Sequence, residues 1–327
     1  MICEFEDKIF TVQPTGFDQL ALEIFQFQYQ NNPVYQQYVN LLPSVGRPSS
    51  VEQIPFLPIR FFKTYPIQTG SFSPETVFES SGTTQTGNSR HYIKDLNVYR
   101  KSFLQNWQQQ YGPVKDWCII GLLPSYLERE HSSLVFMADE LIRLSGDANS
   151  GFYLYEYEKL HTLLTRLEQE KQKTMLIGVT FALLEFAEKY PLPLKHTVIM
   201  ETGGMKGRRR EMTRQEVHDL LKKAFGIHTV HSEYGMTELL SQAYSAGEGI
   251  YNCPPWMKVL VRNEEDPFEI KEKGSGVLDI IDLSNLYSCS FIATDDVGVV
   301  AANGSFTVQG RVDNSDIRGC SLLVTSL

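Results

Sequence analysis

Residues 174–179 read TMLIGV, an uncharged run between two segments with helical spacing, Leu160–Gln172 and Phe181–Lys189. Short apolar runs of this kind are typical of strands buried on both faces. The same alternation continues on both sides, with strands predicted at Trp117–Leu123, Thr197–Glu201 and Ile227–Val230 and helices at Ser132–Leu144 and Thr213–Phe225. The predicted fold class is therefore α/β, with a mainly parallel, helix-covered sheet. Ligands of such sheets bind at the carboxyl ends of the strands.

The segments before this alternation predict further helices and one extended stretch. Phe17–Leu42 has helical spacing interrupted at Asn32-Pro33, which predicts two helices, and Asp95–Tyr111 predicts another. Val51–Ile67 is apolar but is broken by prolines, which exclude a regular helix. We expect it to cross the surface as an extended lead-in to the residues that follow.

The chain after Ile250 has a different character. Short strands separated by Gly, Asp and Asn turns are predicted at Met257–Arg262, Gly276–Asp282, Ser288–Ala293 and Gly304–Gln309. We predict an α/β body over residues 1–250, with the N-terminal helices as its lead-in, and a β-rich module with the C-terminal tail over residues 251–327. No linker-like stretch separates them, so we expect one structural unit.

Composition limits the partners and the compartment. The chain has 327 residues and a formal net charge of −9, which argues against nucleic acid or anionic membrane surfaces as partners. Its five cysteines are scattered, with no zinc-like spacing. We find no signal-peptide pattern and no apolar run near the ~20 residues that a membrane span needs. We therefore expect a cytoplasmic protein with reduced thiols.

One polar stretch stands out because it can bury nothing. Ser80–Arg90 reads SSGTTQTGNSR, with many hydroxyl groups around Gly82 and Gly87. Glycines that adopt positive φ let backbone N–H groups form a concavity for anions, and hydroxyl groups add donors. Two interpretations stay open on these residues alone: a phosphate-binding loop and an ordinary surface turn.

Three further polar stretches follow predicted strands. They are SEYGMTE at 232–238, IATDDVG at 292–298 and GRVDNSDIRG at 310–319. We expect the first to follow the strand Ile227–Val230, the second to form a turn between strands, and the third to come after the last strand. Each one alone also fits an ordinary turn.

The order of these four stretches resembles the adenylate-forming superfamily of acyl, aryl and aminoacyl ligases, from about Ser80 to Gly319. Within it the chain is most similar to the acyl-protein synthetases of the bacterial luminescence system, the LuxE type, with phenylacetate–CoA ligases next. PSYLER at Pro124–Arg129, ETGGMKGRRREM at Glu201–Met212 and RGCSL at Arg318–Leu322 carry this closer resemblance. The resemblance implies the large body of an adenylate-forming enzyme.

The resemblance also implies ATP and Mg²⁺ as cofactors. Its nucleotide-binding residues are Ser81, Gly82, Thr83 and Thr84 for the triphosphate, Gly203 and Gly204 beside adenine, Tyr234 stacked on adenine with Gly235 after it, Asp296 at the ribose hydroxyls, and Arg311 at the ribose or the phosphates. Thr237 would touch the α-phosphate and Glu238 would bind Mg²⁺. Asp295 is given no ribose role, because Asp296 fills the acid position of T-x-D-x-G.

The sequence departs from the superfamily pattern in two ways. Gln85 stands where the phosphate loop usually has a glycine, and Arg90 is the nearest cation where a lysine is usual. Relatives also continue into a further small lobe that carries a lysine for the first half-reaction. This chain ends at Leu327, so we expect no such lobe, with the lysine role unfilled or taken by Lys206 or an arginine of Arg208–Arg210.

The resemblance implies three catalytic residues, which are Thr237, Glu238 and Cys320. Acyl-protein synthetases pass the acyl group to a cysteine near their carboxyl terminus, and Arg318 beside Cys320 would favour the thiolate. The implied activity is ATP-dependent activation of a carboxylic acid, expected to be a fatty acid, with transfer through Cys320 to a partner acyl reductase. Two alternatives stay open: an acyl-CoA or acyl-carrier ligase, and a lapsed nucleotide-binding regulatory subunit.

Overall fold

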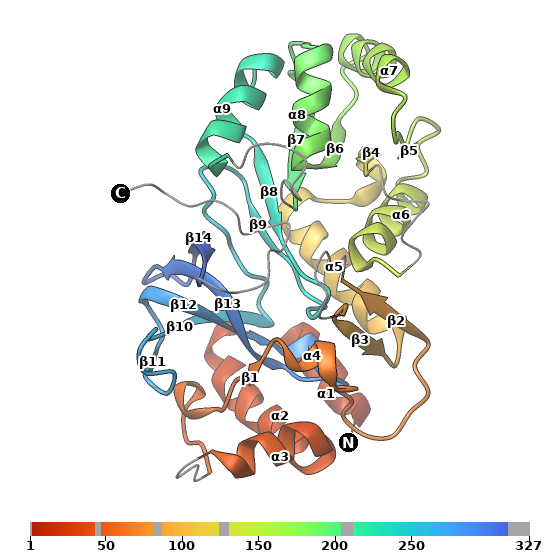
Figure 1. Cartoon of the computed structure of the whole chain (residues 1–327). Coiled ribbons are helices and arrows are strands. Elements are labelled where there is room, and N and C mark those ends of the chain that lie inside the picture. Colours follow the sequence, from red (N-terminus) through yellow and green to blue (C-terminus); the bar gives the residue numbers. More distant parts are fainter. Residues whose placement is uncertain (1, 43–46, 81–86, 124–130, 204–211, 313–327) are drawn as a thin grey trace. The chain divides into compact units, whose positions relative to one another are not determined.

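The computed structural model describes residues 2–42, 47–80, 87–123, 131–203 and 212–312 (Figure 1). The chain divides into two compact units. Within the described ranges, unit 1 holds residues 2–103, 235–242 and 252–312, and unit 2 holds residues 104–234 and 243–251. The predicted division at residue 250 stays a prediction. No described helix is long and apolar enough to cross a membrane.

Unit 2 is built on a mainly parallel sheet with the strand order β5-β4-β6-β7-β8-β9. The strands are β4 Cys118–Leu122, β5 Gly151–Phe152, β6 Thr174–Val179, β7 Thr197–Thr202, β8 His231–Tyr234 and β9 Ala243–Ser245. Neighbouring strands run parallel except β8 and β9, which are antiparallel. Strand β6 has the predicted bounds and is buried at every position, as its uncharged sequence requires.

Helices cover this sheet and supply its core. They are α6 Ser133–Ser145, α7 Tyr157–Gln169, α8 Thr180–Lys189 and α9 Arg214–Phe225 (green to teal in Figure 1). Helix α9 begins with a capping box, in which the Thr213 side chain accepts from the Glu216 N–H group and the Glu216 side chain accepts from the Thr213 N–H group. Leucines and phenylalanines of α7, α8 and α9 pack on Ile120, Leu176 and Ile199. The predicted α/β class is confirmed.

One predicted strand of unit 2 was placed too early. We expected a strand at Ile227–Val230, but β8 comprises His231–Tyr234. The reason is the hydrogen-bond ladder: His231 is the first residue that pairs with β7, opposite Met200. Local β-propensity in Ile227–Val230 does not show where a partner strand begins. SEY of SEYGMTE is therefore part of the strand and not a loop after it.

Unit 1 contains a second sheet with the order β1-β13-β12-β10-β11, and β14 pairs with β13. The strands are β1 Leu57–Pro58, β10 Met257–Arg262, β11 Ile270–Lys271, β12 Gly274–Asp282, β13 Phe291–Val300 and β14 Phe306–Arg311. All the pairs are antiparallel except β1 with β13. A separate two-stranded sheet pairs β2 Thr76–Glu79 with β3 Arg90–Ile93.

The acidic stretch IATDDVG is not a turn, contrary to our expectation. Residues 292–298 lie inside β13, which continues to Val300 where we had predicted an end at Ala293. Adjacent acids usually disfavour a strand, but Arg311 of the paired strand β14 compensates both carboxylates here. Strand β14 likewise reaches Arg311, so the Gly310-Arg311 pair belongs to the strand and does not follow it.

Unit 1 also contains helices. They are α1 Ile2–Thr11, α2 Phe17–Asn31, α3 Pro33–Leu41, α4 Phe61–Thr64 and α5 Leu96–Tyr111, the last of which continues into unit 2. The predicted break at Asn32-Pro33 is confirmed, because the Asn32 side chain caps α3 by accepting from the Tyr35 N–H group at 3.0 Å.

The proline-rich stretch at residues 51–67 does not cross the surface as we expected. It forms a short 3-10 helix at Val51–Gln53, then β1 and then α4. Leu57, Phe62 and Ile67 are fully buried. Leu57 pairs with Ile292 at the edge of the sheet, a position where Pro58 can be accommodated although it lacks an N–H group. The stretch is part of the core of unit 1.

Candidate functional site

The described ends of the polar stretch at residues 80–90 adjoin the paired strands β2 and β3 of unit 1. Glu79 and Arg90 are paired residues, and Ser80 N–H donates to the Ser89 carbonyl at 3.0 Å. Ser89 N–H donates in turn to the Ser80 hydroxyl oxygen at 2.9 Å. The two ends of the stretch are therefore held together. The predicted triphosphate ligands lie outside the described residues; they are Ser81, Gly82, Thr83 and Thr84.

Thr237 and Glu238 lie in a segment that unit 1 anchors through buried polar groups. Glu238 is fully buried, and its carbonyl accepts from Asn285 Nδ2 at 2.8 Å. The Asp282 carboxylate accepts from the N–H groups of Leu240 and Ser241, each at 2.9 Å. Because these bonds hold the backbone on the carboxyl side of Glu238, the position of its carboxylate is constrained.

His91, which we did not single out from the sequence, contacts the same segment. Its Nδ1 lies 2.9 Å from the Thr237 carbonyl oxygen, and its Nε2 lies 2.8 Å from Ser288 Oγ. Burial lowers the pKa of His91 to about 4, against smaller opposing contributions from the Thr237 hydrogen bond and Glu238. Its place one residue after Ser80–Arg90 is a signal that the sequence does offer.

Asp296 and Arg311 form an ion pair inside unit 1. Arg311 Nε lies 3.2 Å from Asp296 Oδ1, with side chains that are 7% and 9% exposed. Arg311 Nη2 also lies 3.5 Å from Asp295 Oδ2. The structure thus brings together Asp296, which the resemblance assigns to the ribose, and Arg311, which it assigns to the ribose or the phosphates.

The threonine and glycine of T-x-D-x-G, Thr294 and Gly298, support the backbone around this ion pair. The Thr294 hydroxyl accepts from Asp296 N–H at 3.1 Å and donates to the Leu278 carbonyl at 2.6 Å. The β13–β14 pairing shifts register at Gly298, where an added Cβ would lie 2.1 Å from the Thr307 carbonyl oxygen. Only glycine allows so close an approach of the strands.

Unit 2 holds the two described residues that the resemblance places at adenine. Gly203 follows β7 with a φ of +77°, and Tyr234 ends the neighbouring strand β8. Both therefore lie at the carboxyl ends of adjacent parallel strands. The Tyr234 ring is buried, with its centroid 5.8 Å from that of Tyr251. Gly235 is the next residue along the chain, and Gly204 lies outside the described residues.

A buried acid, Glu233, lies next to Tyr234. Its carboxyl group bonds with the Thr202 hydroxyl, and burial raises its pKa to about 7. The hydroxyl contact and the neighbouring Glu201 modify this shift in opposite directions. No role for Glu233 follows from the sequence, although it lies in the quoted SEYGMTE stretch.

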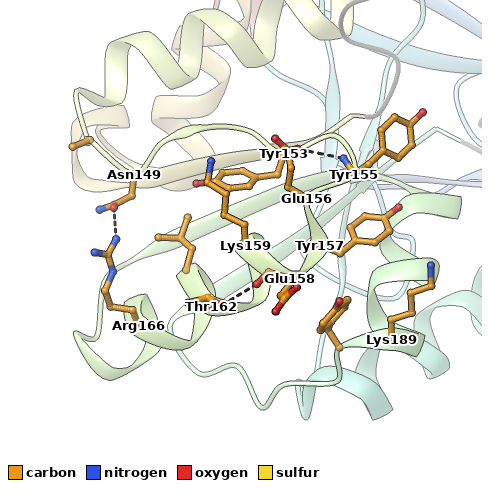
Figure 2. Close-up of a pocket in the computed structure, with 13 residues that line it drawn as sticks. Asn149, Tyr153, Tyr155, Glu156, Tyr157, Glu158, Lys159, Thr162, Arg166 and Lys189 are labelled. Atoms are coloured by element: carbon orange, nitrogen blue, oxygen red, sulfur yellow. Dashed lines mark hydrogen bonds between the residues drawn. The ribbon is translucent and has the colours of Figure 1, made fainter.

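Unit 2 also has an open cavity of about 1150 Å³ beside the start of α7 (Figure 2). Figure 2 shows Tyr153, Tyr155 and Tyr157 around it together with charged side chains of both signs. Lys159 Nζ lies 5.5 Å from the centre of the Tyr153 ring. None of the residues that we predicted for the site lines this cavity.

Three cysteines with described side chains, Cys118, Cys253 and Cys289, are poor nucleophiles. Cys118 and Cys289 are fully buried, and burial raises the pKa of each thiol to about 12. Burial of the sulfur likewise raises the pKa of Cys253 to about 12. The thiolate is the reactive form of cysteine, so these side chains fit a structural role. Cys320 lies outside the described residues.

The predicted Mg²⁺ site can be compared with the acidic and other metal-binding side chains in the described part of the chain. We find there no group of three or more His, Cys, Asp or Glu residues that could hold a metal ion. Mg²⁺ is commonly bound through one or two carboxylates together with substrate phosphates. A single buried carboxylate such as Glu238 fits that mode.

Comparison with known sequences gives a match along nearly the whole chain. The family model of the acyl-protein synthetases, LuxE, matches residues 12–326. A long-chain-fatty-acid–luciferin-component ligase of Aliivibrio fischeri is 24% identical over 91% of this chain and 85% of its own length. A protein of the same name from Vibrio harveyi is 21% identical over 98% of this chain and 92% of its own length.

Comparison with solved structures confirms the fold. A 2-hydroxyisobutyryl-CoA ligase matches with a TM-score of 0.62 and 12% identity, covering 94% of this chain and 70% of the other. The O-succinylbenzoate CoA synthetase of Bacillus subtilis matches with a TM-score of 0.50 and 14% identity, covering 74% and 63%. The chain spans 39% of a coronafacic acid ligase from Pectobacterium brasiliense. At these identities the two matches with TM-scores of 0.50 and 0.62 establish the α/β fold and give no information on the substrate.

Proposed function

Because the chain belongs to the acyl-protein synthetase (LuxE) family, we propose that it uses ATP to activate a long-chain fatty acid and then passes the acyl group to a thiol. The observation that carries the proposal is the buried Asp296–Arg311 pair, at positions that the family resemblance assigns to nucleotide binding. The names of the two bacterial relatives supply the substrate class. The similarity to phenylacetate–CoA ligases rests on the sequence motifs alone.

The first half-reaction joins the fatty acid to AMP. A carboxylate oxygen of the acid attacks the α-phosphorus of ATP, the bond from that phosphorus to the bridging oxygen breaks, and pyrophosphate leaves. The acid supplies the nucleophile, so no protein nucleophile is needed. The protein contributes positioning and electrostatic stabilisation, which together lower the barrier to such a transfer.

The described residues divide these tasks. Asp296 accepts hydrogen bonds from the ribose hydroxyls, and Arg311 keeps its carboxylate oriented from 3.2 Å away. Thr237 contacts the α-phosphate, and Glu238 would hold Mg²⁺, which would offset the triphosphate charge. Tyr234 and Gly203 contact the adenine. An acidic chain with a net charge of −9 needs such local compensation.

The second half-reaction moves the acyl group to Cys320. Its thiolate attacks the acyl carbon, the bond from that carbon to the phosphate oxygen breaks, and AMP leaves with a thioester formed. The buried thiols of Cys118, Cys253 and Cys289 are unsuited to this attack, because burial raises the pKa of each to about 12. A partner acyl reductase then takes the acyl group from the thioester.

Pyrophosphate exchange tests the first half-reaction. The protein is incubated with ATP, Mg²⁺, labelled pyrophosphate and a series of carboxylic acids. We expect label to enter ATP only when an acid is present, and most rapidly with long-chain fatty acids. ATP binding without exchange for any acid would overturn the proposal and favour a lapsed nucleotide-binding subunit.

Acyl labelling tests the second half-reaction. The wild-type protein, Cys320→Ser and the control Cys253→Ser are incubated with ATP, Mg²⁺ and radiolabelled fatty acid. We expect hydroxylamine-labile label on the wild type and the control but not on Cys320→Ser, with pyrophosphate exchange kept in all three. Equal labelling of all three proteins excludes Cys320 as the acyl carrier. In a parallel incubation with added coenzyme A, full acyl-CoA synthesis by Cys320→Ser would instead assign coenzyme A as the acceptor.

A further inference from the structure

We propose that His91 is a positioning residue for fatty acid activation, and that it acts by holding the Thr237 peptide group through its imidazole Nδ1–H. The inference rests on the proposed function, because it deepens the role of Thr237 and Glu238. His91 itself is not placed against the substrate. Its effect passes through the backbone of the segment that carries those two side chains.

The hydrogen bonds of His91 define one tautomer. A carbonyl oxygen can only accept, so the contact of 2.9 Å to Thr237 requires the proton on Nδ1. Nε2 is then an acceptor and receives the Ser288 hydroxyl proton at 2.8 Å. The side chain is 1% exposed, and burial lowers its pKa to about 4. A neutral ring with one donor and one acceptor satisfies both partners at neutral pH.

His91 and Asn285 fix two successive peptide groups. His91 holds the carbonyl of Thr237, and Asn285 Nδ2 donates to the carbonyl of Glu238 at 2.8 Å. Two adjacent carbonyls held in this way leave the backbone between them little freedom to rotate. The positions of the Thr237 and Glu238 side chains are therefore determined by hydrogen bonds to their backbone carbonyls.

The groups behind these two contacts belong to one rigid turn. Ser288 N–H donates to the Asn285 carbonyl at 3.0 Å. Helix α2 and the residue after it secure the turn: Gln28 Nε2 donates to the Asn285 carbonyl at 3.0 Å and Asn32 Nδ2 to the Ser288 carbonyl at 2.9 Å. All of these groups are buried. The turn thus gives Asn285 a fixed position from which to hold the Glu238 carbonyl.

His91 also lies close in sequence to the polar stretch at residues 80–90. It is the second residue of β3 and pairs with Phe78 of β2. The Phe62 ring stands edge-on to the imidazole, with centroids 5.7 Å apart, and limits its rotation. His91 therefore joins the paired strands β2 and β3 to the Thr237–Glu238 segment inside unit 1.

Two substitutions distinguish the contributions of the hydrogen bonds made by Nδ1 and Nε2 of His91. The amide nitrogen of His91→Asn can take the place of Nδ1 and keep the bond to Thr237. The longer side chain of His91→Gln reaches the place of Nε2, keeps a bond to Ser288 and leaves Thr237 without its donor. Ser288→Ala is the matched control, because it removes the Nε2 partner and leaves the Thr237 contact intact.

Pyrophosphate exchange at saturating fatty acid and varied ATP is the readout, with the melting temperature measured in parallel. Small errors in the placement of reacting groups cost up to about 100-fold in rate. We expect His91→Gln to lower kcat by about 10- to 100-fold with less than about a threefold change in the KM for ATP. His91→Asn and Ser288→Ala should keep kcat within about threefold of the wild type.

Equal kcat values for His91→Asn and His91→Gln would overturn the role, as would kcat losses that follow the melting temperatures of all three variants. If the wild-type protein catalyses acid-dependent exchange and either of these results is found, only the role of His91 is overturned. If the wild-type protein shows no acid-dependent exchange, the proposed function is overturned too. Should the variants fail to fold, side-chain ¹⁵N NMR of wild type decides. We expect the His91 proton on Nδ1, and a proton on Nε2 would overturn the inference.

Discussion

Asp296 and Arg311 are direct partners across strands β13 and β14, and Arg311 Nε lies 3.2 Å from Asp296 Oδ1. The pair is buried, so its charges compensate one another where water cannot. Asp295, the neighbour of Asp296, also contacts Arg311, but from 3.5 Å and with a side chain that is 23% exposed. The two adjacent acids are therefore not equivalent, and this difference can be tested.

Asp296→Asn should raise the KM for ATP by about 10-fold or more, because hydrogen bonds to a charged group contribute about 1.5–3 kcal/mol. Asp295→Asn is the matched control, since it removes the other carboxylate beside Arg311. We expect the control to change the KM by less than about threefold. Pyrophosphate exchange over a range of ATP concentrations measures both. Equal effects of the two substitutions would contradict the assignment of the ribose to Asp296.

Gly298→Ala should displace β14 from β13, because its Cβ would meet the Thr307 carbonyl oxygen at 2.1 Å. Overpacking of this kind costs about 1–3 kcal/mol of the free energy of unfolding. Arg311 lies on the displaced strand, so the KM for ATP should rise together with the loss of stability. Gly16→Ala is the control, since an added Cβ there meets nothing within 4 Å. Urea unfolding that is unchanged in Gly298→Ala would refute the expected clash.

Asp282→Ala should destabilise unit 1 by about 3 kcal/mol, because it leaves the buried N–H groups of Ser241 and Ser284 without their acceptor. The loss also releases the segment that carries Glu238, so pyrophosphate exchange should fall. Asp266→Ala is the control: Asp266 also accepts from a backbone N–H group, that of Phe268, but at an exposed site. We expect less than about 1 kcal/mol there. Similar losses of unfolding free energy in both variants would argue against a special role for Asp282.

His218 should make unit 2 sensitive to acid. Burial, with help from Arg214 and Lys222 and against Glu248 and Asp219, lowers its pKa to about 4. The unfolded chain, with a pKa near 6.5, takes up a proton first, so the stabilisation is present above about pH 6.5 and is lost as the pH falls toward 4. At pH 5 the loss amounts to about 2 kcal/mol relative to pH 8.

The difference between the wild type and His218→Gln isolates this contribution. We expect the variant to lose less unfolding free energy than the wild type between pH 8 and pH 5, measured by urea unfolding at each pH. His228→Gln is the control, since that side chain is exposed. A pH dependence of His218→Gln identical to that of the wild type would show that His218 does not carry the effect.

Much of the fold could be predicted because its signals are local. TMLIGV at β6 has the bounds that its uncharged sequence predicts, and the break at Asn32-Pro33 separates α2 from α3. The errors fall where a distant partner decides. His231, not Ile227, begins β8 because Met200 lies opposite it, and the acids of IATDDVG stay in β13 because Arg311 compensates them.

The candidate site shows the same division. The order of the polar stretches along the chain was enough to single out Thr237, Glu238, Asp296 and Arg311 by resemblance to a family, since motif order is a property of the sequence. The part played by His91 could not be read in that way. His91 and Thr237 are separated by 146 positions, and only folding brings the imidazole to 2.9 Å from the Thr237 carbonyl. A single histidine in a short strand has no local pattern that reveals its partners, because its burial and hydrogen bonding are decided by the elements that pack around it.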